Sequence, residues 1–331
     1  MLCTLLLTFG TTANAASQTW VSGNVGDWGN TANWGGAQVP AGTDTATINN
    51  GTAAVTTTQG CGVVLLGNGL ATDVAVLNIS SDLTVSKAST ELFGVSRVVG
   101  ATGTVNQSAG TVRIYHPSAT TGELRLANLA GALGAYNLSG GVLDVQVLNK
   151  GAKDRNVAFN ATGGTLVVRT LINKFGLLSE SASYGFNQGT CKLEVGAIDT
   201  VAAIGFGNGT NLMDYAVGTG GTMNFDIASA SSFDTITQYG SVANTLGATL
   251  QVDLLGGYTP DAGSFFDVWT FSDKTKAGSG AFGVLPAGWT SAWVDTNADL
   301  SLDTLRVTYV PEPATIALLG LGLLAIRRNK K

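Results

Sequence analysis

Short runs of alternating apolar and polar residues follow one another along most of the chain. One clear case has apolar residues at positions 143, 145 and 147, separated by Asp144 and Gln146. This period of two is expected of a strand with one buried face, so Leu143, Val145 and Val147 should point inward. Further strands are predicted near residues 63–66, 74–79, 111–115, 123–126 and 165–171.

The predicted strands recur in a repeat that is centred on a glycine turn. Residues 136–143 read YNLSGGVL, and related stretches occupy residues 105–112, 159–166 and, with a gap, 186–193. The aligned turn positions, spaced by 23 to 31 residues, are Gly51, Asp82, Gly110, Gly141, Gly164, Thr190, Gly221 and Ala248. Such a period is typical of stacked supersecondary units. A rung of roughly 27 residues holds three short strands and three bends, so we predict an all-β fold with a right-handed parallel β-helix over residues 44–253.

Asparagine recurs at one position of this repeat, at Asn106, Asn137, Asn160 and Asn187. Asparagine side chains at equivalent turns of a stacked structure can form an amide ladder. We therefore expect Asn106, Asn137 and Asn160 on adjacent rungs, with their Cα atoms about 5 Å apart.

The segment before the repeats, residues 16–43, contains Trp20, Trp28 and Trp34 among glycine and asparagine residues. The rings could form a platform that stacks on carbohydrate. Alternatively, they could plug the open end of the solenoid, which needs an atypical terminal unit to cover its core. Because large aromatic side chains bury well, we favour a Trp-rich N-terminal cap.

The repeat fades at the other end, and residues 254–309 predict antiparallel strands that form a C-terminal β cap. Within them, Asp295 and Asp299 resemble the start of a calcium-binding loop. That loop would need glycine at its sixth position and glutamate at its twelfth, where this chain has Leu300 and Arg306. We interpret the stretch as a hairpin turn, with weak calcium binding as the alternative.

Composition narrows the classes of function. Charged residues make up 12% of the chain, and outside residues 310–331 there are 13 basic and 21 acidic residues. Such a body repels nucleic acid and anionic membranes. The single histidine, His116, excludes multi-histidine metal sites and argues against a Ser-His-Asp enzyme. We expect no catalytic residues, no metal and no cofactor.

Residues 150–155 form the densest charge cluster of the body, with Lys150, Lys153, Asp154 and Arg155. β-Helical enzymes that cleave acidic polysaccharides use Lys, Arg and calcium-binding Asp residues. Since no second group of aspartates follows at the rung spacing, we interpret the cluster as a solvated loop, with glycan binding as the alternative.

Two cysteines, Cys61 and Cys191, lie beyond the predicted signal peptide. An even number of cysteines in an oxidising compartment favours a disulfide. About five rungs separate these two, or ~24 Å at ~4.8 Å per rung, whereas a disulfide needs Cα atoms within ~7 Å. We therefore predict two free thiols.

The first residues predict a secretory signal peptide over residues 1–15. An apolar run at residues 2–9 precedes Ala13, Asn14 and Ala15, which form a small-x-small cleavage site. We expect cleavage after Ala15 or Ala16. No Lys or Arg precedes the apolar run, so we expect that the natural start lies further upstream.

The last segment, residues 310–331, has three parts in order. Pro311, Glu312 and Pro313 precede an apolar run at residues 316–326. This run predicts a short hydrophobic helix and a marginal anchor, because about 20 apolar residues are needed to span a bilayer comfortably. Four terminal cations should hold the end of the chain on the cytoplasmic side. They are Arg327, Arg328, Lys330 and Lys331.

These three parts resemble the PEP-CTERM sorting signal. The resemblance implies recognition by an exosortase, a membrane cysteine transpeptidase, near Pro311, Glu312 and Pro313. It also implies transient contact with the inner membrane and a bacterium that makes an extracellular polysaccharide matrix. The repeat body is similar, more loosely, to the β-helical passengers of autotransporters, although no translocator barrel follows it.

Two classes of function fit these features. The first is an exported, non-enzymatic structural or adhesive protein of the cell surface or extracellular matrix, favoured by the sorting tail on a low-charge repeat body. The alternative is a β-helical protein that binds or cleaves extracellular polysaccharide, favoured by the fold, the Trp-rich start and the cluster at residues 150–155. Fold analogy alone does not decide between them.

Overall fold

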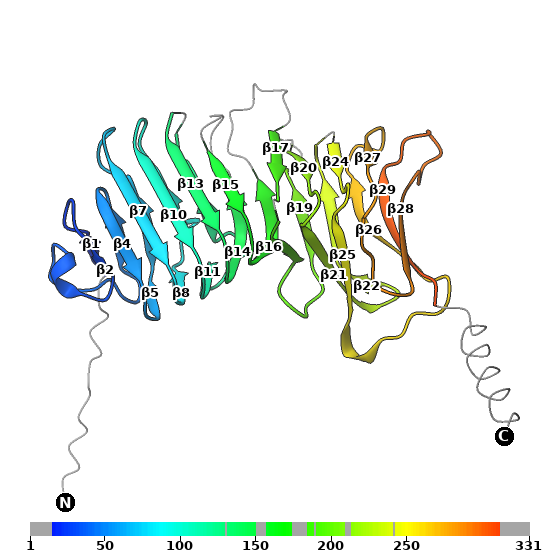
Figure 1. The fold of residues 1–331 in the computed structure, drawn as a ribbon, viewed down its shortest axis with the longest axis horizontal. Coiled ribbons are helices and arrows are strands. Elements are labelled where there is room, and N and C mark those ends of the chain that lie inside the picture. The colour runs from blue at the N-terminus through cyan, green and yellow to red at the C-terminus, as the bar shows by residue number, and fades with distance from the viewer. Residues whose placement is uncertain are drawn as a thin grey trace, which may run out of the picture.

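The chain forms an elongated all-β solenoid (Figure 1). The structure, a computed structural model, describes residues 15–129, 131–149, 157–173, 184–188, 190–208, 213–240 and 242–311. Within them, strands of successive rungs pair in parallel along the long axis of the molecule. The predicted parallel β-solenoid is therefore confirmed.

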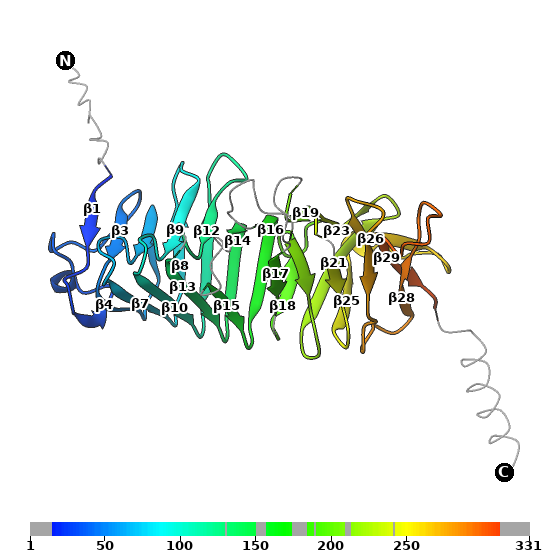
Figure 2. The same cartoon turned by 90° about the horizontal axis from the view of Figure 1, so that it is seen from above.

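One rung shows how the chain makes three faces. Strands β10 (Thr102–Gln107), β11 (Thr111–Tyr115) and β12 (Glu123–Arg125) follow one another along the chain. In the next rung, β10 pairs with β13 (Leu133–Leu138), whereas β11 and β12 both pair with the long β14 (Val142–Asn149). We call the faces that contain β10, β11 and β12 face 1, face 2 and face 3. Figure 2 shows the same stack from a second side.

The remaining strands continue these three faces. Face 1 contains β2 (Val25–Asp27), β4 (Gly51–Val55), β7 (Val74–Ile79), β15 (Ala158–Ala161), β17 (Tyr184–Asn187), β20 (Met213–Ala216), β24 (Val242–Asn244) and β27 (Ala277–Ser279). Face 2 contains β5 (Gln59–Cys61), β8 (Leu83–Ser86), the first part of β16 (Thr165–Asn173), β18 (Lys192–Val195), β21 (Thr222–Ser229) and β25 (Thr249–Leu254). Face 3 contains β1 (Ser17–Thr19), β3 (Thr45–Ile48), β6 (Val63–Leu66), β9 (Glu91–Val95), the second part of β16, β19 (Ala203–Phe206), β23 (Thr235–Gln238) and β26 (Phe265–Phe271).

The predicted asparagine ladder lies on face 1. Asn106 pairs in register with Asn137, and Asn137 with Asn160. Nδ2 of Asn160 donates to Oδ1 of Asn137 at 2.8 Å, and Nδ2 of Asn137 donates to Oδ1 of Asn106 at 2.7 Å. Asn106 donates in turn to Asn78 at 2.9 Å, so the ladder is confirmed and extends one rung further than predicted.

One position of the sequence alignment was wrong. Gly51 begins a strand instead of occupying the turn, because Ala54, three residues later, pairs with Asn78. The turn between β4 and β5 consists of Thr56, Thr57 and Thr58, so it contains no glycine that could mark it. Asn187 pairs in register with Ala216 of the following rung, so no asparagine follows it at this position.

Glycine is required at the repeated turn. Gly110, Gly141 and Gly164 have φ angles of 70°, 76° and 75°, in the left-handed region that favours glycine. Their turns also stack closely. A Cβ atom on Gly164 would lie 2.8 Å from the carbonyl oxygen of Gly141, and one on Gly141 would overlap that of Gly110.

Buried glutamines close two of these turns from inside. Nε2 of Gln107 donates to two main-chain oxygens, and its Oε1 accepts from the hydroxyl of Tyr136 at 2.7 Å. Gln188 repeats this arrangement with Tyr215 at 3.0 Å. The polar side chains are thus satisfied inside the core, as burial requires.

The three tryptophans near the N-terminus are buried, with at most 2% of each side chain exposed. Trp34 packs edge-on against both Trp20 and Trp28, with ring centroids 5.0 and 4.9 Å apart. The structure therefore favours the cap over a sugar-stacking platform. The cap is itself a first rung, since β1 and β2 pair in parallel with β3 and β4.

At the other end, the predicted boundary at residue 253 was wrong. Parallel pairing continues beyond it, because β26 pairs with β23 and β27 pairs with β24. The glycine turn disappears there, but inward residues such as Trp269 and Phe271 stay buried. The predicted antiparallel closure is confirmed by β29 (Thr304–Tyr309), which pairs with β26 and with β28 (Trp289–Val294). The remaining elements are β22 (Ser232–Phe233) and the short 3-10 turns η1 (Thr31–Asn33) and η2 (Leu255–Gly257).

One inward residue was predicted incorrectly. Leu143 and Val145 are buried, but beyond them Leu148 is buried in place of Val147. The register of β14 against β16 shifts between Val145 and Val147, where β14 passes from face 2 to face 3. Because of this shift, the alternation of buried and exposed residues in β14 moves by one position after Val145.

Several predictions fall outside the described residues. These are the signal peptide up to Asn14, the cluster at residues 150–155, and the tail beyond Pro311 with its hydrophobic helix. Within the described ranges, no helix has the length and apolar character needed to cross a membrane.

Candidate functional site

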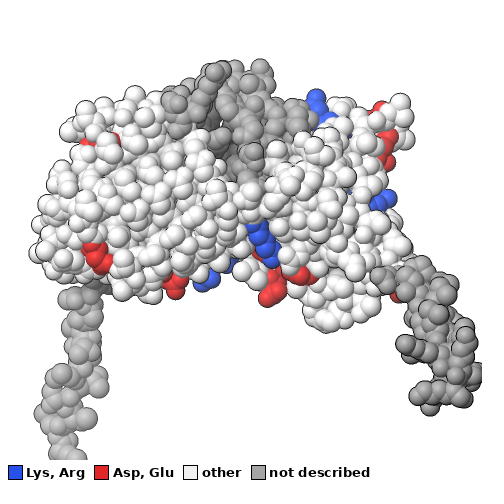
Figure 3. Space-filling view, viewed as in Figure 1, with Lys and Arg blue, Asp and Glu red and all other residues white. Residues whose placement is uncertain are grey.

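Charged side chains are sparse on the molecule, and two groups of them lie on the outward side of face 2. In the view of Figure 3, most of the surface is uncharged, and acidic and basic residues gather in small groups. Arg113 of β11 pairs in register with Asp144 of β14, and the same row continues through Val167 to Glu194 and Asn224. The first three rungs of this row carry a basic groove, and the last rungs carry an acidic cluster.

The basic groove has a cavity volume of about 590 Å³. Two arginines flank one buried carboxylate: Nε of Arg113 donates to Asp144 at 3.0 Å, and Arg169 donates to it twice, at 2.6 and 2.8 Å. The hydrogen bonds that Arg169 donates to Asp144 raise the pKa of Arg169. The groove is lined by Arg113, Tyr115, His116, Pro117, Ser118, Ala119, Thr120, Gln146 and Arg169.

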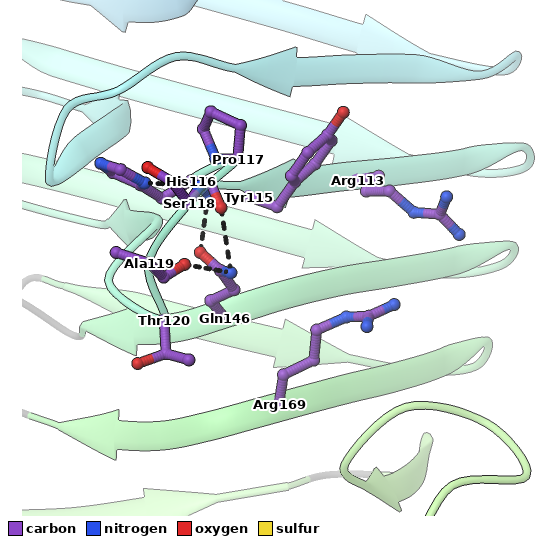
Figure 4. Close-up of a pocket in the computed structure, with 9 residues that line it drawn as sticks. All are labelled: Arg113, Tyr115, His116, Pro117, Ser118, Ala119, Thr120, Gln146 and Arg169. Carbon is purple, nitrogen blue, oxygen red and sulfur yellow. Dashed lines mark hydrogen bonds between the residues drawn. The ribbon is translucent and has the colours of Figure 1, made fainter.

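Gln146 holds the loop that forms one wall of the groove. Its Oε1 accepts from the main-chain N–H groups of His116 and Gly122, both at 2.7 Å, and its Nε2 donates to the carbonyl of Ala119 at 2.8 Å. Figure 4 shows the bonds of Gln146 to His116 and Ala119, with the His116 ring pointing away from the two arginines. Nδ1 of His116 accepts from the N–H of Ser118 at 3.2 Å.

The charge balance of the groove suits an anion. Two guanidinium groups face one carboxylate, which leaves one positive charge. The side chain of Arg113 is 53% exposed, and its terminal Nη groups have no partner among the described residues. Tyr115, partly exposed, adds an aromatic face beside them. Guanidinium groups bind carboxylates and sulfates well, and aromatic rings stack on sugars.

General acid–base chemistry needs groups within hydrogen-bond reach of one another. In the part of the chain that the structure describes, no carboxylate hydrogen-bonds to His116. Asp144 is instead engaged by Arg113 and Arg169. Among the described residues, the groove therefore presents arginine donors beside a carboxylate that is already paired.

The acidic cluster consists of Glu194 on β18, Asp226 on β21 and Asp253 on β25. One oxygen of each carboxylate lies within 4.8 Å of one oxygen of each of the others. Glu194 and Asp226 are buried, with 2% and 0% exposed. Of the described residues, these three offer the arrangement that could hold a metal ion.

The loop predicted to resemble a calcium site is a hairpin turn between β28 and β29, as expected. Asp295 Oδ1 accepts from the N–H groups of Asn297 and Ala298 at 3.0 and 2.7 Å, and its Oδ2 accepts from Leu300 at 2.7 Å. The carboxylate is thus occupied by the main chain of its own turn.

Both cysteines are free and buried, which confirms the prediction. Five strand-to-strand steps on face 2 separate β5, which contains Cys61, from β18, which follows Cys191. Burial raises the pKa of each thiol from 9.0 to about 12. Neither thiol is a nucleophile at neutral pH in the folded chain.

Sequence analysis missed the residues of both groups. Arg113 and Arg169 lie 31 and 25 residues from Asp144, and Asn224 lies 30 and 29 residues from Glu194 and Asp253. These separations match the repeat period. A search for charged residues at rung spacing would have found them.

Comparison with protein families identifies the tail. A family model described as the PEP-CTERM protein-sorting motif matches residues 310–331, which include Pro311, Glu312 and Pro313. The predicted resemblance is thereby confirmed, and the motif indicates an exported protein that an exosortase sorts to the cell envelope or surface. No curated protein matches the chain. The likeness of the body to autotransporter passengers stays a prediction.

Proposed function

We propose that this chain is a non-enzymatic structural or adhesive component of the cell surface or extracellular matrix. The observation that supports this best is the sorting motif at residues 310–331, which directly follows the last strand of the solenoid. The body is a rod of rungs held by parallel pairing between successive rungs, buried apolar residues and the asparagine ladder. Such a body can extend from a surface and resist unfolding without any catalytic centre.

The tail would act in two steps. Residues 316–326 would hold the exported chain briefly in the inner membrane, oriented by the basic end because cations resist translocation. Pro311 and Pro313 favour an extended backbone around Glu312, which suits a segment that enters the active site of an exosortase. Cleavage near Pro313 would then release the solenoid to the surface or matrix.

The test is mass spectrometry of the C-terminal peptide of the protein from its native host. We expect a terminus near Pro313, and we expect that replacing Pro311, Glu312 and Pro313 with alanine keeps the chain in the membrane fraction. Recovery of intact Lys331 on surface protein would contradict this, as would unchanged localisation of the triple variant.

The N-terminus that signal-peptide cleavage would create lies beside a carboxylate. The main-chain nitrogen of Ala16 donates to Oδ1 of Asp44 at 2.8 Å. Cleavage of the signal peptide after Ala15 would turn this nitrogen into an ammonium group beside a carboxylate, whereas cleavage after Ala16 would remove it. N-terminal sequencing of the mature protein should therefore begin at Ala16, and a start at Ser17 would contradict this.

The basic groove favours a second function, which is the binding of an acidic extracellular polysaccharide. An anionic group of the sugar would sit at the exposed guanidinium of Arg113, and a sugar ring would pack on Tyr115. Because a charge-assisted hydrogen bond contributes about 1.5–3 kcal/mol, Arg113→Gln should weaken binding to a carboxylated glycan about tenfold.

A matched control is available at the far end of the solenoid. Arg306 forms a two-bond pair with Asp267, at 2.6 and 2.9 Å, much as Arg169 does with Asp144. Arg306→Gln should leave glycan binding unchanged. Equal binding of polygalacturonate and neutral dextran would exclude the groove as a specific site, and depolymerisation lost in His116→Ala would favour an enzyme instead.

A further inference from the structure

The acidic cluster on face 2 has more negative charge than its surroundings balance. Glu194, Asp226 and Asp253 contribute three negative charges, and of the described residues Lys192 forms a salt bridge with them, with Nζ 2.9 Å from Oε2 of Glu194. A net charge of minus two therefore remains on the three carboxylates, and one divalent cation would neutralise it. Buried charges are normally paired or bound to a metal.

Of the three carboxylates, that of Asp226 has the fewest partners that compensate its charge. Its side chain is 0% exposed, and neither of its carboxylate oxygens forms a hydrogen bond of normal geometry, although the main-chain N–H of Thr200 lies near the carboxylate. The turns above it close the site: Oδ2 of Asp234 accepts from the N–H of Asp226 at 2.7 Å, and Oδ1 accepts from that of Ala202 at 2.6 Å.

The buried amide of Asn224 also points to a ligand at this site, independently of the three carboxylates. It is 0% exposed, and its Nδ2 donates to Oε1 of Glu194 at 2.7 Å and to Oδ2 of Asp253 at 3.0 Å. Its Oδ1, also buried, has no partner. The oxygen and nitrogen of an amide are distinguished by their hydrogen bonds. Turning this amide by 180° would place a neutral oxygen ligand between the two carboxylates.

We propose that Glu194, Asn224, Asp226 and Asp253 form a calcium site that ties together the rungs of β18, β21 and β25. The ligands are all oxygen atoms of carboxylate and amide groups, which hard cations prefer and which zinc or copper sites rarely use alone. The site is separate from the basic groove and does not depend on the proposed function.

The distances between the carboxylate oxygens favour calcium over magnesium. The carboxylate oxygens lie within 4.8 Å of one another. Calcium–oxygen distances of about 2.3–2.6 Å allow ligands on opposite sides of the ion to be about 5 Å apart, whereas magnesium, at about 2.1 Å, draws them to about 4.2 Å. Asp253 is partly exposed, so water can complete the coordination from that side.

Calorimetric titration of the metal-free mature full chain tests the proposal. We expect one calcium ion per chain with a Kd of about 10⁻³ M or tighter, the range of extracellular modules, and weaker binding of magnesium. Asp226→Asn, which removes the charge and keeps the shape, should weaken calcium binding at least tenfold. Asp299→Asn, in the exposed hairpin turn, is the matched control and should bind as the parent chain does.

Melting temperatures separate loss of the site from loss of the fold. Saturating calcium should raise the Tm of the parent chain by roughly 5 °C, and should not raise that of Asp226→Asn. In EDTA, Asp226→Asn should melt at or above the Tm of the parent chain, because it removes an unpaired buried charge. Lower melting in EDTA would show that the carboxylate is already satisfied, for example by a proton, and would overturn the proposal.

Two other results would also overturn it. The first is the absence of calcium binding at 10 mM, roughly tenfold above the weakest expected Kd. The second is binding that Asp299→Asn abolishes and Asp226→Asn preserves, which would assign the ion to the hairpin turn.

Discussion

Two regions of face 2 place charged side chains on its outward side but balance their charges in opposite ways. In the basic groove, Asp144 is 5% exposed at its side chain, and two arginines on adjacent rungs neutralise it. In the acidic cluster, Asp226 is equally buried, and its neighbours on adjacent rungs are Glu194 and Asp253. The same strand register therefore gathers arginines around a carboxylate in one region and brings carboxylates together in the other.

This difference shows what the solenoid contributes to function. Parallel pairing fixes which outward residues of successive rungs meet, and the sequence of each rung decides their charge. Burial then decides the energetic result, because a carboxylate with partners is stable inside and one without partners needs a proton or a metal. The following predictions test this contrast, first in the two regions themselves and then elsewhere in the molecule.

The largest expected effect concerns the turns that precede the two groups. Gly141→Ala puts a side chain at positive φ and against the carbonyl of Gly110, so it should destabilise the fold by about 3 kcal/mol or more. Gly220 also has positive φ, but an added Cβ would meet the Cγ2 atom of Thr190 at 3.0 Å, which can shift.

Gly220→Ala should therefore cost only about 1–2 kcal/mol. Urea denaturation followed by circular dichroism measures both variants. Equal costs would show that the turns before β14 and β21 are packed alike.

Removing the charge of a buried carboxylate should change stability in opposite directions in the basic groove and in the acidic cluster. Asp144→Ala leaves two arginines without their carboxylate and should destabilise by about 2 kcal/mol, a value reduced because both guanidinium groups are partly solvated. Asp226→Asn, without calcium, should be neutral or stabilising by about 1 kcal/mol. Urea midpoints in EDTA measure both, and a loss of stability in both variants would remove the contrast.

A smaller effect is expected on face 1, away from both groups. Asn137→Ala removes two hydrogen bonds of the amide ladder, to Asn106 and Asn160. Since these side chains are partly exposed, the cost should be about 1 kcal/mol. The affinities of the groove for glycan and of the cluster for calcium should stay unchanged, and a change in either would mean that the ladder sets the register of face 2.

The smallest effect is expected at the cysteines, one in each half of the molecule. With pKa values raised to about 12, Cys61 and Cys191 stay protonated and should not react with iodoacetamide at pH 8. In the unfolded chain both should react, giving two labels per mature chain by mass spectrometry. Their raised pKa values stabilise the fold below about pH 9, and this contribution is lost as the pH rises towards 12. Labelling of one thiol in the native state would indicate local opening near it.

Much of the architecture could be predicted because it depends on local signals that repeat. The alternation around Leu143, the glycine turns and the recurring asparagines predicted the solenoid, the ladder and the five rungs between Cys61 and Cys191. The signals were weaker where the turn chemistry changes. Parallel pairing through β26 and β27 has no glycine motif, so the solenoid was predicted to end near residue 253.

The two charged groups could not be predicted in the same way. Asp144 and Gln146 read as ordinary outward residues, and no local pattern shows that Arg113 and Arg169 come to flank the first of them. The register shift within β14 and the unequal rung lengths decide which residues meet. In the acidic cluster, the burial of Asp226 depends on turns around Ala202 and Asp234 that fold over an outward position. That covering is a property of the tertiary structure.

The most direct test of the contrast is a crystal structure of the mature full chain with calcium, with anomalous diffraction measured to locate the ion. We predict one anomalous peak among the oxygens of Glu194, Asp226 and Asp253, at calcium–oxygen distances of about 2.3–2.6 Å. We predict no peak in the groove beside Arg113. A map with no peak at the acidic cluster, or with its peak beside Asp295, would contradict the account.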